Sequence, residues 1–182
     1  FANKERYYQP AEVTTSSVES DPNAGSFNPD LATGPDKNYS RIEMNVKEEN
    51  TKDGEGTLIA VLDNSFQLNH EALVDLSDDQ VKYTKAEMQA MVTGNSLIAT
   101  GSFDKLYYNN KVPFYYDYAN SDNNVLNVKE NHGIHVSSIA AANGPYKGIA
   151  PNAQLALMKV FPDSGSGASD GTVLRALNDC AK

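Results

Sequence analysis

Residues 56–63 read Gly-Thr-Leu-Ile-Ala-Val-Leu-Asp, and this stretch decides the fold. Residues 57–62 form a continuous run of apolar and β-branched side chains, which is typical of a strand buried on both faces of a parallel sheet. Asp63 follows the run directly, at the carboxyl end of the predicted strand, where open α/β sheets form their sites. An aspartate after a strand also commonly caps a turn, so the stretch alone leaves both roles open.

The last third of the chain alternates between helix and strand patterns. Residues 131–142 have the small and β-branched side chains of a buried helix, and Asn143-Gly144-Pro145 is a typical helix stop. Residues 154–161 form a second buried strand, and residues 162–171 form a Ser/Gly loop. Residues 172–182 predict a helix with one apolar face, made of Val173, Leu174, Leu177 and Cys180. The order strand, helix, strand, helix predicts a parallel α/β sheet.

The chain divides into an arm and a domain. Residues 1–53 are polar and interrupted by prolines and glycines, which predicts an irregular arm with little core of its own. Residues 54–182 contain the patterns of the α/β domain, with a polar and aromatic insertion at about 75–130. Within that insertion we expect a short helix at 85–92 and a strand around 111–118.

Composition excludes some classes of partner. The formal net charge of -9 argues against nucleic acid, because phosphate backbones require a basic surface. No apolar run approaches the roughly 20 residues that cross a bilayer, so no transmembrane segment is expected. The first residues lack the layout of a secretory signal. The single cysteine, Cys180, excludes an internal disulfide framework and fits a small buried hydrophobic residue.

A histidine pair marks the start of the helix expected at 131–142. His132 stands in its first turn, so a strand aspartate and a helix histidine could meet. A carboxylate bonded to one imidazole nitrogen fixes the tautomer, and the other nitrogen then acts as a general base. Gly133 would let a substrate chain approach closely. The alternatives are a histidine that caps its own helix and a His-x-x-His metal pair with His135.

Three blocks of the sequence resemble the subtilase family. Residues 56–63 are similar to its Asp block, and His132-Gly133-Ile134-His135-Val136-Ser137-Ser138 is similar to its His block. Residues 148–155, followed by Met158-Lys159-Val160, are similar to the strand segment that follows the His helix in subtilases. The resemblance covers about residues 54–74 and 131–182. It implies an α/β, parallel-sheet subtilisin-like fold, of which this chain forms the N-terminal portion.

The resemblance also implies roles for individual residues. Asp63 would be the acid of a catalytic triad, His132 its general base and later acid, and His135 a structural residue. The Ser/Gly loop corresponds to the subtilase strand that pairs with the substrate backbone, so recognition there would use main-chain groups. The substrate-binding residues would be Ser166, Gly167 and Ala168. Without the resemblance, such a loop is more simply a connector.

A narrower resemblance is to the lactocepin-like cell-envelope proteinases. It depends on Asn69-His70-Glu71-Ala72, on residues 111–118, and on the wide gap between the Asp and His blocks. It implies protein or peptide substrates, a secreted or cell-wall-associated location, and chemistry without a required cofactor. Structural Ca²⁺ is a weaker, further hypothesis, because oxygen-bearing side chains cluster before the His helix, although a solvated polar turn is the simpler explanation of them. These residues are Asp117, Asp122, Asn123 and Asn124.

The chain does not contain the nucleophile of a subtilase. The family's Gly-Thr-Ser motif and oxyanion asparagine would lie beyond Lys182, and Ser164 and Ser166 lack the strand-to-helix setting of a nucleophile. The last expected helix also reaches Lys182 without a stop signal. We therefore expect the remaining polypeptide of the same precursor to supply the serine and to complete the sheet.

Two departures from the subtilase pattern motivate a second hypothesis. Ser65 and Ser138 stand where the family commonly has glycine, and Ser65 is expected to need a backbone angle that a β-carbon resists. The leading hypothesis is a serine endopeptidase, and the alternative is a pseudoprotease that binds or regulates. A third, a metal-binding module built on His132 and His135, needs further ligands that the sequence does not place nearby.

Overall fold

Three parallel strands form the central sheet, in the order β2-β4-β3. In the computed structural model of the protein, the described residues are 7–8, 46, 53–93, 102–164 and 167–181. The central strand β4 is buried along its whole length, as expected for a strand with a neighbour on each side and a layer on each face. The predicted α/β class with a parallel sheet is confirmed. The three strands are β2 (Leu58–Asp63), β3 (Phe114–Asp117) and β4 (Gln154–Lys159).

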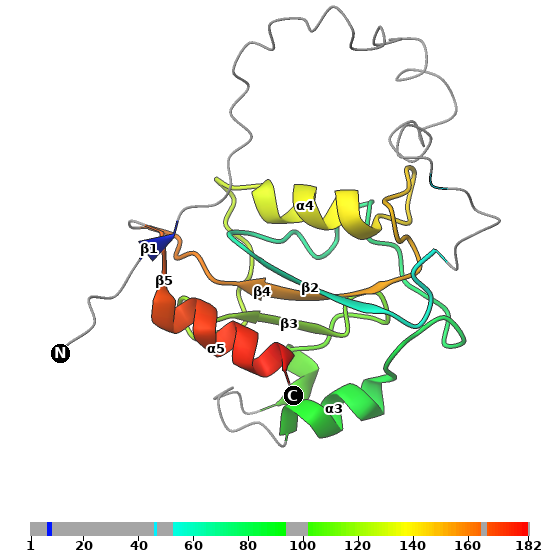
Figure 1. Ribbon diagram of the computed structural model, residues 1–182, viewed down its shortest axis with the longest axis horizontal. Helices are drawn as coiled ribbons and strands as arrows, with labels where there is room; N and C mark the ends of the chain where they lie inside the picture. The colour runs from blue at the N-terminus through cyan, green and yellow to red at the C-terminus, as the bar shows by residue number, and fades with distance from the viewer. Residues whose placement is uncertain (1–6, 9–45, 47–52, 94–101, 165–166, 182) are drawn as a thin grey trace, which may run out of the picture.

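Helices cover both faces of this sheet (Figure 1). Helix α4 (His132–Ala141) lies on one face, and α3 (Lys85–Thr93) and α5 (Asp170–Cys180) lie on the other. Side chains of β4 alternate between the layers: Leu155 and Leu157 pack in the cluster that contains α4, whereas Ala156 and Met158 pack in the cluster that contains α3 and α5. Because successive side chains of β4 point to opposite faces of the sheet, this one strand contributes to both hydrophobic cores.

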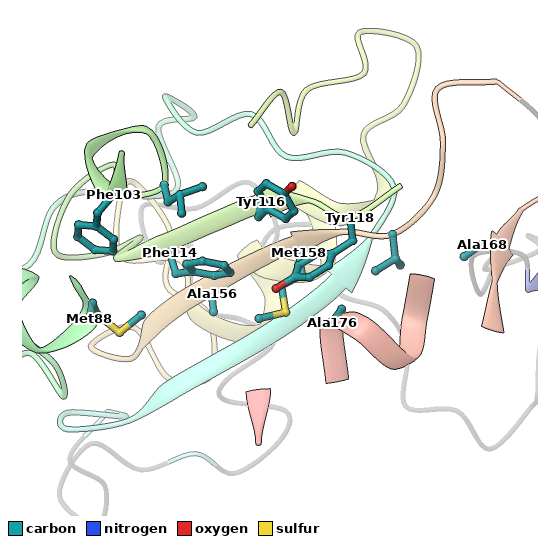
Figure 2. Packing of buried hydrophobic residues seen from close by; sticks show 11 residues of the cluster. Met88, Phe103, Phe114, Tyr116, Tyr118, Ala156, Met158, Ala168 and Ala176 are labelled. Atoms are coloured by element: carbon teal, nitrogen blue, oxygen red, sulfur yellow. The ribbon is translucent and has the colours of Figure 1, made fainter. Parts of the chain in front are cut away.

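The core on the α3 and α5 face is rich in aromatic and methionine side chains, which Figure 2 shows at close range. Tyr116 and Tyr118 meet edge to face, with ring centroids 5.0 Å apart. Phe103, from the short 3₁₀ helix η2 (Phe103–Lys105), belongs to the same cluster. The stretch expected as an insertion thus contributes both a strand of the sheet and a large part of the core.

A second, two-stranded sheet joins the arm to the Ser/Gly loop. Strand β1 (Tyr7–Tyr8) pairs antiparallel with β5 (Ala168–Ser169), with Tyr7 opposite Ser169 and Tyr8 opposite Ala168. Most of the arm lies outside the described residues. Helix α5 begins two residues earlier than predicted, because the Ser169 side chain accepts a hydrogen bond from the Thr172 N–H and caps it.

The predicted apolar face of α5 is partly wrong. Val173 packs against the core and Ala176 is buried, but Leu174 and Leu177 are 63% and 49% exposed. Cys180 is exposed as well, although its sulfur lies 3.5 Å from Sδ of Met158. The helix meets the sheet through the narrow side that carries Ala176, so the bulky leucines point away. Among the described residues, no helix has the length and apolar character needed to span a membrane.

Candidate active site

The structure brings together the two side chains singled out at the ends of β2 and α4. Nδ1 of His132 lies 2.9 Å from both carboxylate oxygens of Asp63. The Asp63 side chain is 9% exposed and the imidazole 24% exposed, so the carboxylate is enclosed while the ring stays accessible. Because the two residues are 69 positions apart, the contact depends on how α4 packs across the sheet.

The alternation of side chains along β2 and the glycine at position 133 bring Asp63 and His132 into contact. Along β2, Ile59 and Val61 pack in the α4 cluster, and Asp63 continues the same alternation at the end of the strand. At Gly133, an added β-carbon would lie 2.4 Å from the carbonyl oxygen of Ser65. Glycine therefore allows the first turn of α4 to approach the end of β2 closely. The predicted purpose of Gly133 is wrong in one respect, because the protein's own backbone fills the space expected for a substrate chain.

Asn64 links the two elements, and the sequence analysis missed it. The Asn64 N–H donates to Oδ1 of Asp63 at 2.7 Å, and its side-chain oxygen accepts from the Gly133 N–H at 3.2 Å. The N-cap residue Asn131 makes no side-chain capping bond, so Asn64 satisfies an amide in the first turn of α4 from the neighbouring strand. Its side-chain amide also donates to Glu130 at 3.1 Å. The feature of the sequence that could have pointed to Asn64 is its position, because it is a polar residue directly after the strand aspartate.

This geometry supports proton transfer by the imidazole. An ionised carboxylate only accepts hydrogen bonds, so Asp63 selects the His132 tautomer with its proton on Nδ1. The lone pair is then on Nε2, which can take a proton from a hydroxyl, and the carboxylate stabilises the imidazolium that results. The pair is therefore competent as the acid and base of a nucleophilic triad.

Comparison with known proteins agrees with the geometry. A family model described as the subtilase family matches residues 54–181. The chain belongs to the subtilase family. It is 36% identical over 140 residues to the PII-type proteinase of Lactococcus lactis subsp. cremoris, covering 71% of this chain and 7% of that protein. It is 31% identical over 126 residues to the C5a peptidase of Streptococcus pyogenes serotype M18 (strain MGAS8232), covering 65% of this chain and 10% of that protein.

Two facts follow from these comparisons. The resemblance inferred from the sequence blocks is confirmed at the level of the family. This subtilase chain spans only 7% to 10% of the length of the relatives it matches, so those proteins contain large regions that have no counterpart here.

Ser65 and Ser138, where subtilases commonly have glycine, fit their places well. Ser65 is buried, and its hydroxyl donates to the Asn127 carbonyl at 3.0 Å and accepts from the Asn127 N–H at 2.8 Å. Among the described residues, only Asp53 and Ser121 combine a side chain with a positive φ, so the expected strain at Ser65 is wrong. The Ser138 hydroxyl donates to the Ile134 carbonyl at 2.7 Å within α4.

The remaining predicted site residues belong to the Ser/Gly loop and to helix α4. Ser166 is outside the described residues. Gly167 has φ +99°, a conformation that favours glycine, and leads directly into β5, where Ala168 is buried and pairs with Tyr8. His135 is exposed on α4 and lines a separate surface groove together with His70, away from the Asp63 carboxylate.

The side chains of the predicted calcium cluster have separate partners. The Asp117 carboxylate contacts the Lys159 ammonium, Asp122 accepts from the Asn124 N–H at 2.8 Å, and the Asn123 amide donates to the Lys105 carbonyl at 3.4 Å. Within the described ranges, no three His, Cys, Asp or Glu side chains converge as a metal site would require. Calcium binding by this subtilase stays a prediction.

Proposed function

We propose that this chain supplies the acid and the base of a serine endopeptidase that hydrolyses peptide bonds in protein substrates. The observation that carries the proposal is the His132 Nδ1 atom, 2.9 Å from both oxygens of Asp63. His132 takes the serine proton through Nε2 as the hydroxyl attacks the carbonyl carbon, and later returns a proton to the leaving amine. Membership of the subtilase family, and relatives named proteinase and peptidase, support it.

The nucleophilic serine and the oxyanion donor belong, in this proposal, to the remaining polypeptide of the same precursor. The partial exposure of the His132 ring supports this assignment, because a hydroxyl from another segment can approach it. The much greater length of the relatives is consistent with a catalytic domain that continues beyond the matched region.

Substrates bind, we propose, as an extended strand along residues 166–168. The pairing of β5 with Tyr7–Tyr8 supports this mode, since it shows a short antiparallel strand held along the backbone of Ala168–Ser169. Main-chain pairing is largely independent of side-chain identity, and it therefore suits an endopeptidase that acts on unfolded protein segments.

The location and the cofactor requirement are also proposals. A secreted or cell-wall-associated enzyme is supported by the resemblance to lactocepin-like cell-envelope proteinases and by the acidic composition. The Asp63–His132 pair needs no cofactor for proton transfer. Ca²⁺ would act on loop stability, and the thermal midpoint of the complete protein with Ca²⁺ or with a chelator tests it.

The test of the proposed function uses the complete protein. His132→Ala should abolish labelling by a serine-directed fluorophosphonate and reduce peptide hydrolysis to the residual acceleration of roughly 10³- to 10⁴-fold over water that the oxyanion hole and substrate binding provide. Asp63→Asn should preserve the fold and lower turnover by about 10⁴, because the amide favours the wrong tautomer. His135→Ala, at an exposed position on the same helix, is the matched control and should retain both activities.

The pseudoprotease alternative has its own decisive outcome. An intact wild-type protein that neither hydrolyses varied unfolded substrates nor reacts with the fluorophosphonate would favour it over the endopeptidase. The serines in place of the usual glycines, which motivated the pseudoprotease alternative, give that alternative little support. Ser65 and Ser138 both form hydrogen bonds without disturbing the Asp63–His132 contact.

A further inference from the structure

A second charged group lies at the same edge of the sheet as Asp63. In the register of the parallel sheet, Lys159 on β4 is the direct partner of Asp63 on β2 and of Asp117 on β3. The side chains of Lys159 and Asp117 are fully buried and form an ion pair. The proton transfers proposed for Asp63 and His132 use neither residue.

Stability alone is a poor explanation for this buried pair. Taking two charges out of water costs several kcal/mol per ion, and apolar side chains of similar volume are often equally stable or more stable in such places. Buried ion pairs are better suited to fixing one geometry, because each charge accepts few arrangements of partners. The contacts around Lys159 and Asp117 show which geometry is fixed.

Two further residues close a ring around the pair. Nζ of Lys159 contacts Asp163 Oδ1 at 3.0 Å, and the Asn120 amide donates to Asp117 at 3.0 Å and to Asp163 at 3.4 Å. The other oxygen of Asp117 accepts the N–H groups of Ala119 and Asn120, both at 2.9 Å. We call this ring of Asp117, Asn120, Lys159 and Asp163 the clamp.

The clamp holds the start of the segment that leads to β5. Asp163 follows β4 and precedes β5 in the chain, and its bonds to Lys159 and Asn120 hold the residues directly after β4 against the ends of β3 and β4. Helix α5, which begins directly after β5, bonds to the same edge of the sheet. From α5, Arg175 donates to the Tyr118 carbonyl at 2.7 Å, and Asp179 accepts from the Tyr118 hydroxyl at 2.8 Å.

We propose that the clamp positions β5 relative to the Asp63–His132 pair and so determines how well extended substrates bind in register with the catalytic residues. Lys159 connects the catalytic pair with the residues that lead to β5, since it is the strand partner of Asp63 and the side-chain partner of Asp163. The proposal rests on the proposed function and adds positioning residues to it. The clamp residues act through β5 and contact no reacting atom.

The experiment compares long and short substrates in the complete protein. Asp163→Ala removes the tether to the loop and keeps the buried pair, while the double variant Lys159→Met/Asp117→Asn removes both buried charges together, so that neither is left unpaired. Asp104→Asn is the matched control, because it breaks the exposed Lys85–Asp104 pair of 2.8 Å, which belongs to α3 and η2.

Both clamp variants should raise KM for an eight-residue peptide by about tenfold and leave kcat within about twofold. Hydrolysis of a single-residue ester and the rate of fluorophosphonate labelling should change by less than about twofold, since neither probe contains an extended chain that can pair with β5. The control should match the wild type on every substrate. Affinity for a non-cleavable extended peptide, measured by fluorescence anisotropy, should fall in parallel with the change in KM.

Other outcomes separate the clamp from the catalytic proposal. Equal losses on long and short substrates, or unchanged KM and affinity whether or not the thermal midpoint falls, would overturn the positioning role. A wild type that fails to label or hydrolyse would overturn the proposed function instead, and peptide affinity would then decide the clamp. If that wild type also binds no extended peptide, both proposals fall.

Discussion

Three small contacts decide whether Asp63 and His132 can meet. Asn64 bonds to both Asp63 and the first turn of α4, Gly133 allows the close approach, and Ser65 ties its buried hydroxyl to Asn127. The Asn64–Gly133 bond, the Ser65–Asn127 bond and the approach of Gly133 to Ser65 each join segments that are tens of positions apart in the chain. At the scale of single residues, the geometry of the pair is therefore set by the residues directly after Asp63 and directly after His132.

Gly133→Ala tests this view. The new β-carbon would meet the Ser65 carbonyl at 2.4 Å and Cε1 of Phe66 at 2.9 Å, and backbone cannot yield as a flexible side chain can. We expect a loss of stability of about 1–3 kcal/mol, as for other overpacked sites. Displacing His132 by even 1 Å should lower kcat/KM by about 10². Thermal unfolding and peptide hydrolysis measure the two effects.

The control for this substitution is His135→Ala, at an exposed position two residues further along α4. If Gly133→Ala kept the stability and activity of this control, close packing of α4 on β2 would not be what sets the catalytic contact.

At the scale of secondary-structure elements, β5 has two roles that conflict. It pairs with Tyr7–Tyr8 of the same chain, and it is the strand along which we propose that substrates bind. An extended substrate that pairs with the same backbone groups must displace β1. Competition between the two strands should therefore weaken the binding of extended substrates.

Removing the pairing capacity of β1 tests this competition. Tyr7→Pro/Tyr8→Pro deletes both backbone N–H groups, and it should lower KM for extended peptides by roughly threefold to tenfold, because proline cannot donate to a sheet. Tyr7→Thr/Tyr8→Thr changes the same side chains and keeps the N–H groups, so it should behave like the wild type. A proline variant with unchanged or raised KM would show that β1 and the substrate do not compete.

At the scale of the whole molecule, the described part of the chain leaves apolar surface without cover. Leu174 and Leu177 of α5 are exposed, and an apolar cavity of about 180 Å³ lies between the sheet, α3 and α5. In the central sheet, β2 and β3 each pair only with β4, among the described residues. Uncovered apolar patches and strand edges favour association with another polypeptide.

We expect the 182-residue chain by itself not to form a compact, cooperatively melting monomer. The same residues should be ordered when the remaining polypeptide is present, because that polypeptide would cover the α5 leucines and the sheet edges. Circular dichroism and hydrodynamic radius of the isolated chain measure this directly. A compact monomer with a sharp thermal transition would contradict the expectation.

Lys111 should make the stability of the folded protein depend on pH. Its buried ammonium donates to the carbonyls of Pro151 and Ala153 at 2.7 Å each, and burial lowers the pKa of Lys111 from 10.5 to about 7. Between these two values the unfolded chain binds more protons than the folded one. The free energy of unfolding should therefore rise with pH in this window, by at most about 1.4 kcal/mol per pH unit.

Calorimetry of the complete protein at pH 7, 8 and 9 measures the effect. The thermal midpoint of the wild type should rise with pH relative to that of Lys111→Met, which lacks the titrating group. Parallel pH profiles for the two proteins would show that Lys111 does not lose its proton in the folded state within this range.

The sequence by itself determined the α/β class, the positions of two strands and the helix that starts at His132. Of the two strands, only β4 is buried along its whole length, whereas β2 was predicted to be buried on both faces and is partly exposed. Apolar runs and helix stops are local patterns, so they can be read without knowing the neighbours. The blocks around Asp63 and His132 also carried the resemblance to subtilases, which the family match confirmed. The strand around 111–118 was predicted too, but its place in the sheet was not.

Only the tertiary structure decided the register that aligns Asp63, Lys159 and Asp117, the pairing of β1 with β5, and the exposure of Leu174 and Leu177. It also gave Asn64 and Gly133 their roles between β2 and α4. These features join residues that are tens of positions apart, or depend on which side of a helix meets the sheet. Local periodicity carries no information about such contacts, because they arise when whole elements pack and each side chain finds partners from other segments.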